Sequence, residues 1–114
     1  MKIIKDKIKL DTIFETAEKM FGDMVKAVVD IEKKDLAIDA AMHSDLEKLL
    51  LENGSEQKNL WGINLYPAFF ETKNFIEFDS MINIRPFQGN RSRSVENIDI
   101  QNKIIKLVNE KVKK

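Results

Sequence analysis

The sequence predicts a single α+β domain, in which a mainly antiparallel sheet of four or five strands carries about three helices. Residues 61–66 and 76–85 alternate apolar and polar side chains, as strands do, and three other segments have the apolar spacing of amphipathic helices. A chain of 114 residues supports one hydrophobic core, so residues 1–114 are expected to form one domain. The predicted order of elements is (β)αββαββα.

The first predicted elements are a strand candidate within Lys2–Leu10 and a helix over 12–21. Thr12 and Glu15 match a capping box, and apolar residues recur at helical spacing after them until Gly22. This combination predicts a short amphipathic helix with a glycine at its end.

The strongest local pattern is a β-hairpin centred on Lys33 and Lys34. Pairing Val29 with Ile38 places only apolar residues on one face of the two strands. Two lysines do not favour a two-residue turn, so a four-residue loop with the same pairing is equally expected.

Three further segments complete the predicted fold. Ser44 and Glu47 form a second capping box for a helix over 45–53, and Asn97 is expected to cap a helix over 98–112. Strands over 61–66 and 76–85 end at prolines. All three helices are expected on one face of the sheet. The residues expected to be buried against them are Val25, Val29, Ile38, Phe78 and Ile82.

Composition excludes several functional classes. The chain has no cysteine and one histidine, which excludes disulfides, thiolate metal sites, Cys nucleophiles and multi-histidine metal sites, and favours a reducing, cytoplasmic setting. No apolar run approaches the length of a signal peptide or a membrane span. Basic and acidic residues number 19 each, so nucleic acid is not a favoured partner, although residues 81–114 are locally basic.

The first candidate site is the polar face of the second predicted strand pair. If Ile63 pairs with Phe78, then Asn64 lies opposite Glu77, and Glu77 and Asp79 point the same way. Two such carboxylates can bind a divalent cation or act as acid and base. The alternative is a solvated face on which Arg85 neutralises a carboxylate. The residues expected to converge are Asn64, Glu77, Asp79, Asn83 and Arg85.

The second candidate site is the loop before the last helix, which contains Asn90, Arg91 and Arg93. Arginine forks and free N–H groups near a helix N-terminus suit a phosphate or carboxylate. The alternative is an ordinary exposed loop whose arginines pair with the acidic middle of the chain. His43 is either a helix-entry residue or the one available imidazole base, with Asp39 or Asp45 as its partner.

Four stretches of the sequence carry a resemblance to a known family: Leu49–Ser55, Leu60–Pro67, Glu77–Pro86 and Asn90–Ser92. They resemble a family of small prokaryotic proteins known only as a domain of unknown function. The resemblance implies membership and supplies no activity and no catalytic residue.

Three functional hypotheses therefore remain open. The first is a small binding domain that holds an anionic ligand or partner through Arg85, Arg91 and Arg93 with Asn90. The second is a small enzyme, assisted by a divalent metal, that uses Glu77 and Asp79. In this enzyme hypothesis, the two carboxylates are assisted by Asn64, Asn83 or His43. The third is a homo-oligomer that uses the second hairpin and Phe69–Phe70. The sequence indicates no particular cofactor.

Overall fold

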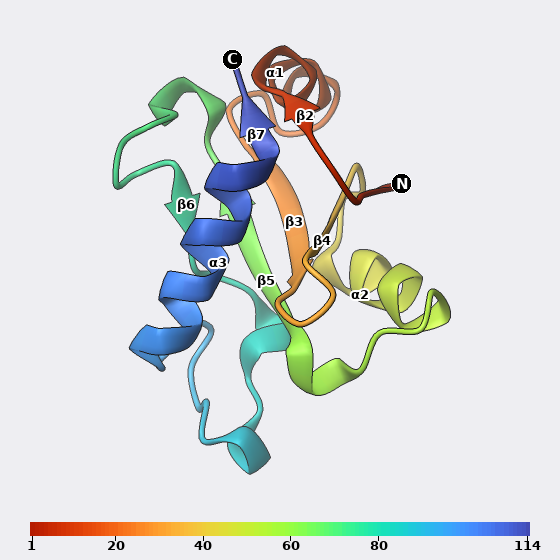
Figure 1. Ribbon diagram of the computed structural model, residues 1–114, viewed down its shortest axis with the longest axis vertical. Coiled ribbons are helices and arrows are strands. Elements are labelled where there is room, and N and C mark those ends of the chain that lie inside the picture. The colour runs from red at the N-terminus through yellow and green to blue at the C-terminus, as the bar shows by residue number, and fades with distance from the viewer.

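The computed structural model describes residues 1–114 and confirms a single α+β domain (Figure 1). The main sheet is antiparallel, with five strands in the order β1-β4-β3-β5-β6. Its strands are β1 Lys2–Ile4, β3 Val25–Asp30, β4 Asp35–Ile38, β5 Leu60–Leu65 and β6 Ile76–Glu77. The helices are α1 Leu10–Lys19, α2 His43–Glu52 and α3 Ile98–Lys111.

A second, two-stranded sheet joins residues near the two ends of the chain. β2 (Ile8–Lys9) pairs in parallel with β7 (Val112–Lys113), which follows α3 directly. Ile8 and Val112 are both buried in the larger core cluster. None of the three α-helices combines the length and the apolar character that a bilayer crossing requires.

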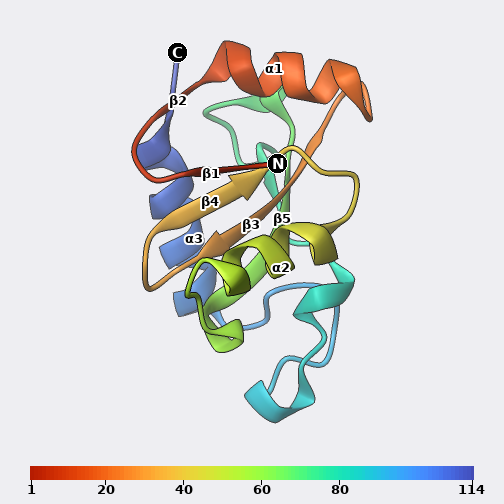
Figure 2. The same cartoon turned by 90° about the vertical axis from the view of Figure 1, so that its right-hand side faces the viewer.

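The prediction that all helices lie on one face of the sheet is wrong. α1 and α3 cover one face, where Val29, Leu36 and Trp61 are buried, and α2 covers the other (Figure 2). Val28 and Ala37 alternate with the first set along β3 and β4, and they pack against the helix α2. The main sheet is therefore the middle of three layers, because its central strands are apolar on both faces.

The β3–β4 hairpin forms as predicted, but its register differs from the predicted one by two residues. Val29 pairs with Leu36 rather than with Ile38, and a turn of four residues, 31–34, connects the strands. The cause is the buried Asp30, whose Oδ1 accepts hydrogen bonds from the N–H groups of Glu32 and Lys33 at 2.9 Å. A shift of two residues preserves the face of each side chain, so Val25, Val29 and Ile38 are buried as expected.

Only one of the three predicted helix caps is present. α1 begins at Leu10 and α2 at His43, so Thr12 and Ser44 lie inside the first turns and neither caps its helix. Asn97 does cap α3, because its Oδ1 accepts hydrogen bonds from Asp99 N (2.8 Å) and Ile100 N (3.2 Å).

The strand predicted over 76–85 is wrong beyond Glu77. β6 ends there, and the chain continues through short 3₁₀ turns at Met81–Asn83 and Pro86–Gln88. Gly62 explains the departure, since a Cβ atom on it would lie 2.5 Å from Ser80 Cβ, so the chain crosses closely over β5. The side-chain amide of Asn83 then makes the hydrogen bonds to β5 that the backbone of a neighbouring strand would otherwise make. Its Oδ1 accepts from Gly62 N at 2.8 Å and its Nδ2 donates to Gly62 O at 2.9 Å.

This crossing also separates two residues that were expected on one face. Phe78 packs against the core on the α1 and α3 side, whereas Ile82 packs against the core beneath α2. Both side chains are only partly buried. The predicted pairing of Asn64 with Glu77 is confirmed, because it lies before the crossing.

Candidate functional site

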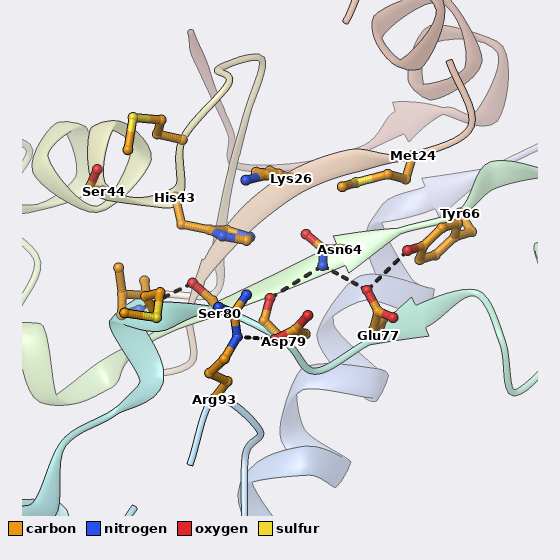
Figure 3. Close-up of a pocket in the computed structure, with 13 residues that line it drawn as sticks. Met24, Lys26, His43, Ser44, Asn64, Tyr66, Glu77, Asp79, Ser80 and Arg93 are labelled. Atoms are coloured by element: carbon orange, nitrogen blue, oxygen red, sulfur yellow. Dashed lines mark hydrogen bonds and ion pairs between the residues drawn. The ribbon is translucent and has the colours of Figure 1, made fainter. Parts of the chain in front are cut away.

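A pocket of about 380 Å³ lies where α2, β5 and the segment after β6 meet (Figure 3). β3 contributes Lys26 and α2 contributes His43, while Asn64 projects from β5. The start of α2 and the crossing after β6 therefore form opposite walls around a floor made by the sheet. The pocket is lined by Met24, Lys26, Met42, His43, Ser44, Asn64, Tyr66, Glu77, Asp79, Ser80, Met81, Ile82 and Arg93.

Asn64 is held in one orientation by its neighbours. Its Nδ2 donates to Glu77 Oε1 at 2.8 Å and to the backbone oxygen of Asp79 at 3.3 Å. Both partners can only accept hydrogen bonds, so the side-chain atom that faces them is the amide nitrogen and the atom that points away is the amide oxygen. That atom, Oδ1, is buried and has no hydrogen-bond partner within the chain. The pocket thus contains one unsatisfied buried acceptor.

His43 supplies a second acceptor. The ring is buried, and Nε2 lies 2.8 Å from the backbone oxygen of Ile63. Because a carbonyl can only accept, Nε2 carries the proton, and Nδ1 of the neutral ring has a free lone pair. Burial lowers the pKa of His43, and the charge of Lys26 lowers it a little further. The hydrogen bond to Ile63, the charge of Asp79 and the amide of Asn64 act in the opposite direction, but the net effect is a lowered pKa. The imidazole is therefore neutral near pH 7.

The carboxylates of the pocket are each engaged. Glu77 Oε1 also accepts from the Tyr66 hydroxyl at 3.1 Å, and burial together with this hydrogen bond raises the pKa of Tyr66. Arg93 Nε donates to Asp79 Oδ1 at 2.6 Å in a half-exposed ion pair. No group of three or more acidic or histidine side chains in residues 1–114 is arranged to hold a metal ion.

The structure brings five of the predicted site residues together and leaves four elsewhere. His43, Asn64, Glu77, Asp79 and Arg93 line the pocket. The other four, Asn83, Arg85, Asn90 and Arg91, do not line it.

Two of these four stabilise the backbone around β5. Asn83 makes its hydrogen bonds to Gly62, as described above. Arg85 is buried, its guanidinium donates to the backbone oxygens of Gln57 and Leu60, and it stacks over the Trp61 ring at 4.2 Å. The predicted convergence of Asn83 and Arg85 with Glu77 is therefore not what the structure shows.

The loop at 90–96 is organised around its own carboxylate. Glu96 Oε2 accepts from the backbone N–H groups of Arg91 (2.9 Å) and Ser92 (2.8 Å). The hydrogen bonds from Ser92 and Arg91 hold the pKa of Glu96 below its usual value. The buried Asn90 fastens the same loop by donating to Asn83 O and Ser94 O, both at 2.7 Å. The backbone N–H groups of Arg91 and Ser92, which the sequence suggested for an anionic ligand, are therefore already bound to the carboxylate of Glu96.

Sequence reasoning missed Lys26 as a site residue. Lys26 pairs with Asn64 across β3 and β5, and its Nζ lies 5.3 Å from the centre of the Phe21 ring. Lys26 reaches the site because β3 pairs with β5. The sequence predicted two separate hairpins and no pairing between them, so it did not place Lys26 beside Asn64. Tyr66 stands two residues after Asn64, so the period-two rule places both on one face.

Comparison with known proteins gives a family without an activity. No significant match was found among curated proteins or among solved structures. A family model described as "Protein of unknown function (DUF5674)" matches residues 2–111, which is nearly the whole chain. The resemblance inferred from the sequence to a domain of unknown function is thus confirmed, and the chain belongs to this family.

Proposed function

We propose that the protein is a binding domain and that the pocket described above holds a small polar molecule. The bound molecule donates hydrogen bonds to Asn64 Oδ1 and His43 Nδ1 and presents an anionic group to Arg93. The observation that carries the proposal is the buried Asn64 Oδ1 without a partner. Leaving such an acceptor unpaired costs on the order of 1–3 kcal/mol, which a ligand N–H or O–H group recovers.

The two acceptors define the donor end of the ligand. Asn64 and His43 line one pocket, and neither Oδ1 nor Nδ1 can satisfy the other while the imidazole is neutral. An amino group satisfies both acceptors because it has more than one hydrogen to donate, whereas a hydroxyl satisfies only one of them. Glu77 is held by Asn64 and Tyr66, so it adds negative charge that favours an amino group over a hydroxyl.

The anionic end of the ligand is assigned to Arg93. Its Nε binds Asp79, which positions the guanidinium while its terminal amino groups make no hydrogen bond within the chain. These groups suit a carboxylate or phosphate. The proposal keeps the anion-recognising binding domain expected from the sequence and uses Arg93 with Lys26, since Arg85 and Asn90 are occupied within the fold.

Thermal-shift screening with hydroxy acids, amino acids and phosphorylated metabolites tests this proposal. A ligand at 100 times its Kd stabilises the native state by about 2.7 kcal/mol, which is readily measured. The shift should disappear in Asn64→Ala and persist in Asn102→Ala, whose side chain is exposed on α3. Equal shifts in both variants would contradict the assignment of Asn64.

A second candidate function, catalysis by proton transfer, is favoured by the state of His43. Its proton is held at Nε2 by the carbonyl of Ile63, and the lowered pKa leaves Nδ1 as a base at neutral pH. The metal-assisted version, with Glu77 and Asp79 as ligands, remains a prediction. Calorimetry with Mg²⁺, Mn²⁺ and Ca²⁺ tests it, and the absence of heat with all three would end that version.

The homo-oligomer hypothesis and the cytoplasmic location also remain predictions. Phe70 packs edge-on against Phe75, with ring centres 5.2 Å apart, whereas Phe69 is 49% exposed. Phe69 is therefore the member of the pair available to a second copy. Sedimentation velocity of the wild type and of Phe69→Ser tests this, because a dimer that uses Phe69 should dissociate in the variant.

A further inference from the structure

A second pocket, separate from the first, is lined mainly by lysine. It has a volume of about 210 Å³ and lies between the loop after β1, the β3–β4 turn and the end of α3, which share one side of the molecule in Figure 2. Its five lysines come from three separate parts of the chain. They are Lys5, Lys7, Lys33, Lys34 and Lys111.

Four of the five ammonium groups are held in place by the fold. Lys7 Nζ donates to the backbone oxygen of Glu110 at 2.7 Å, and Lys111 Nζ donates to the backbone oxygen of Lys5 at 3.0 Å. In addition, Lys5 Nζ donates to Asp35 Oδ2 at 3.1 Å, and Lys33 Nζ to the backbone oxygen of Asn53 at 2.8 Å. An ammonium group has three donors, so each positioned group retains donors for a ligand.

Lys111 is the unusual member of the group. Its side chain belongs to a residue that is only 6% exposed, and its hydrogen-bond partner is a neutral carbonyl. Lysine is rarely buried without a paired charge. Burial lowers the pKa of Lys111, and the charges that face it are Asp35, Asp6 and Glu110, opposed by Lys7. The fold thus keeps an amine at the base of an already cationic pocket.

The charges around the pocket do not balance within the chain. Five lysines line it against two acids, Asp6 and Glu110, while the buried Asp35 lies behind Lys5 and Lys33. A neighbouring hollow of about 350 Å³ shares Lys34 and adds Lys103 and Lys106, with Glu32 as its one further acid. Like charges at this density repel one another, and a bound anion removes that repulsion.

We propose that this pocket binds the phosphate groups of a small phosphorylated molecule. Lysine ammonium groups bind phosphate as point charges, and the spare donors converge from three segments of the chain. No aromatic side chain lines either hollow, so no base-stacking platform accompanies the charges. The small volume favours one or two phosphate groups over a drug-sized ligand.

Calorimetry with inorganic pyrophosphate on the full chain tests the proposal. Lys34→Gln is the main variant, because Lys34 is exposed and its Nζ makes no hydrogen bond or ion pair in the fold. We expect binding in the wild type, roughly tenfold weaker binding in Lys34→Gln, and further weakening as salt rises from low to physiological concentration. The matched control is Lys19→Gln on α1, outside both hollows, which should bind as the wild type does.

A second variant separates a ligand site from a structural role. Lys111→Met keeps the apolar stem and removes the charge, so we expect it to lose pyrophosphate binding and to unfold at an equal or higher temperature than the wild type without ligand. Equal affinity of wild type and Lys34→Gln would overturn the proposal, as would no heat with pyrophosphate. Binding of a single-stranded oligonucleotide with no response to pyrophosphate would also overturn it in favour of a nucleic-acid surface.

Discussion

Replacing Arg85 by lysine removes a two-pronged contact that fastens the segment after β6 to the start of β5. The guanidinium donates to the backbone oxygens of Gln57 and Leu60 and stacks on Trp61. A hydrogen bond from a charged donor contributes about 1.5–3 kcal/mol. Lysine has no fork and retains one such bond, so Arg85→Lys should lower the free energy of unfolding by about 1.5–3 kcal/mol. Alanine loses both bonds, and we expect roughly twice that cost.

Thermal denaturation followed by circular dichroism measures these effects. For a domain of 114 residues, 1 kcal/mol corresponds to a shift in Tm of about 4 °C. Arg85→Lys should therefore lower Tm by about 6–12 °C. Arg91→Lys is the matched control, because Arg91 is exposed and only its backbone N–H makes a hydrogen bond. A Tm for Arg85→Lys as high as that of Arg91→Lys would refute the reasoning.

Three further predictions concern stability. Gly62→Ala should cost about 1–3 kcal/mol, because the new Cβ would lie 2.5 Å from Ser80 Cβ, and urea denaturation should show partial recovery in Gly62→Ala/Ser80→Gly. Asn97→Ala should cost about 1 kcal/mol through loss of the α3 cap, whereas Thr12→Ala, which removes no cap, should cost less in the same assay. Folding lowers the pKa of His43, so as the pH falls the imidazole is protonated in the unfolded chain before it is protonated in the folded one. The free energy of unfolding should therefore fall as the pH drops below the usual imidazole pKa of 6.5. His43→Gln should flatten this part of the pH profile, and an unchanged slope would contradict the buried neutral imidazole.

Apolar alternation was sufficient to predict which side chains of β3 and β4 are buried, but not how the strands pair. Val29 and Ile38 face the core in any register shifted by two residues, so burial alone does not distinguish these registers. The choice is made by Asp30, whose carboxylate closes the turn through hydrogen bonds to Glu32 and Lys33. Such a contact leaves no mark in the hydrophobic pattern.

The segment after β6 shows the opposite failure, in which the pattern continues and the strand does not. Residues 76–85 alternate except at Ser80 and Met81, yet β6 ends at Glu77 and the chain then crosses over β5 where Ser80 passes Gly62. The absence of a side chain at Gly62 permits this crossing, and the side-chain amide of Asn83 then makes hydrogen bonds to the backbone N–H and C=O groups of Gly62. Tertiary contact therefore overrides a local strand preference.

The candidate site was partly predictable for the same reasons. Asn64 and Glu77 come together through strand pairing, which the sequence predicts correctly. His43 and Lys26 join them only because α2 covers the second face of the sheet and β3 pairs with β5. The burial of Arg85 was not predictable, because arginine is ordinarily exposed and its carbonyl partners, Gln57 and Leu60, belong to a distant 3₁₀ turn and the start of β5.

The positions of the aromatic residues give this protein two separate optical probes. The single tryptophan, Trp61, is 2% exposed in the core, so its fluorescence emission should shift to longer wavelength only when the fold opens. The single tyrosine, Tyr66, lines the pocket and donates to Glu77, so its near-ultraviolet absorbance should respond to a change beside Glu77. A ligand that alters the tyrosine signal and leaves tryptophan emission unchanged can be recognised as binding at the pocket without labels or added chromophores.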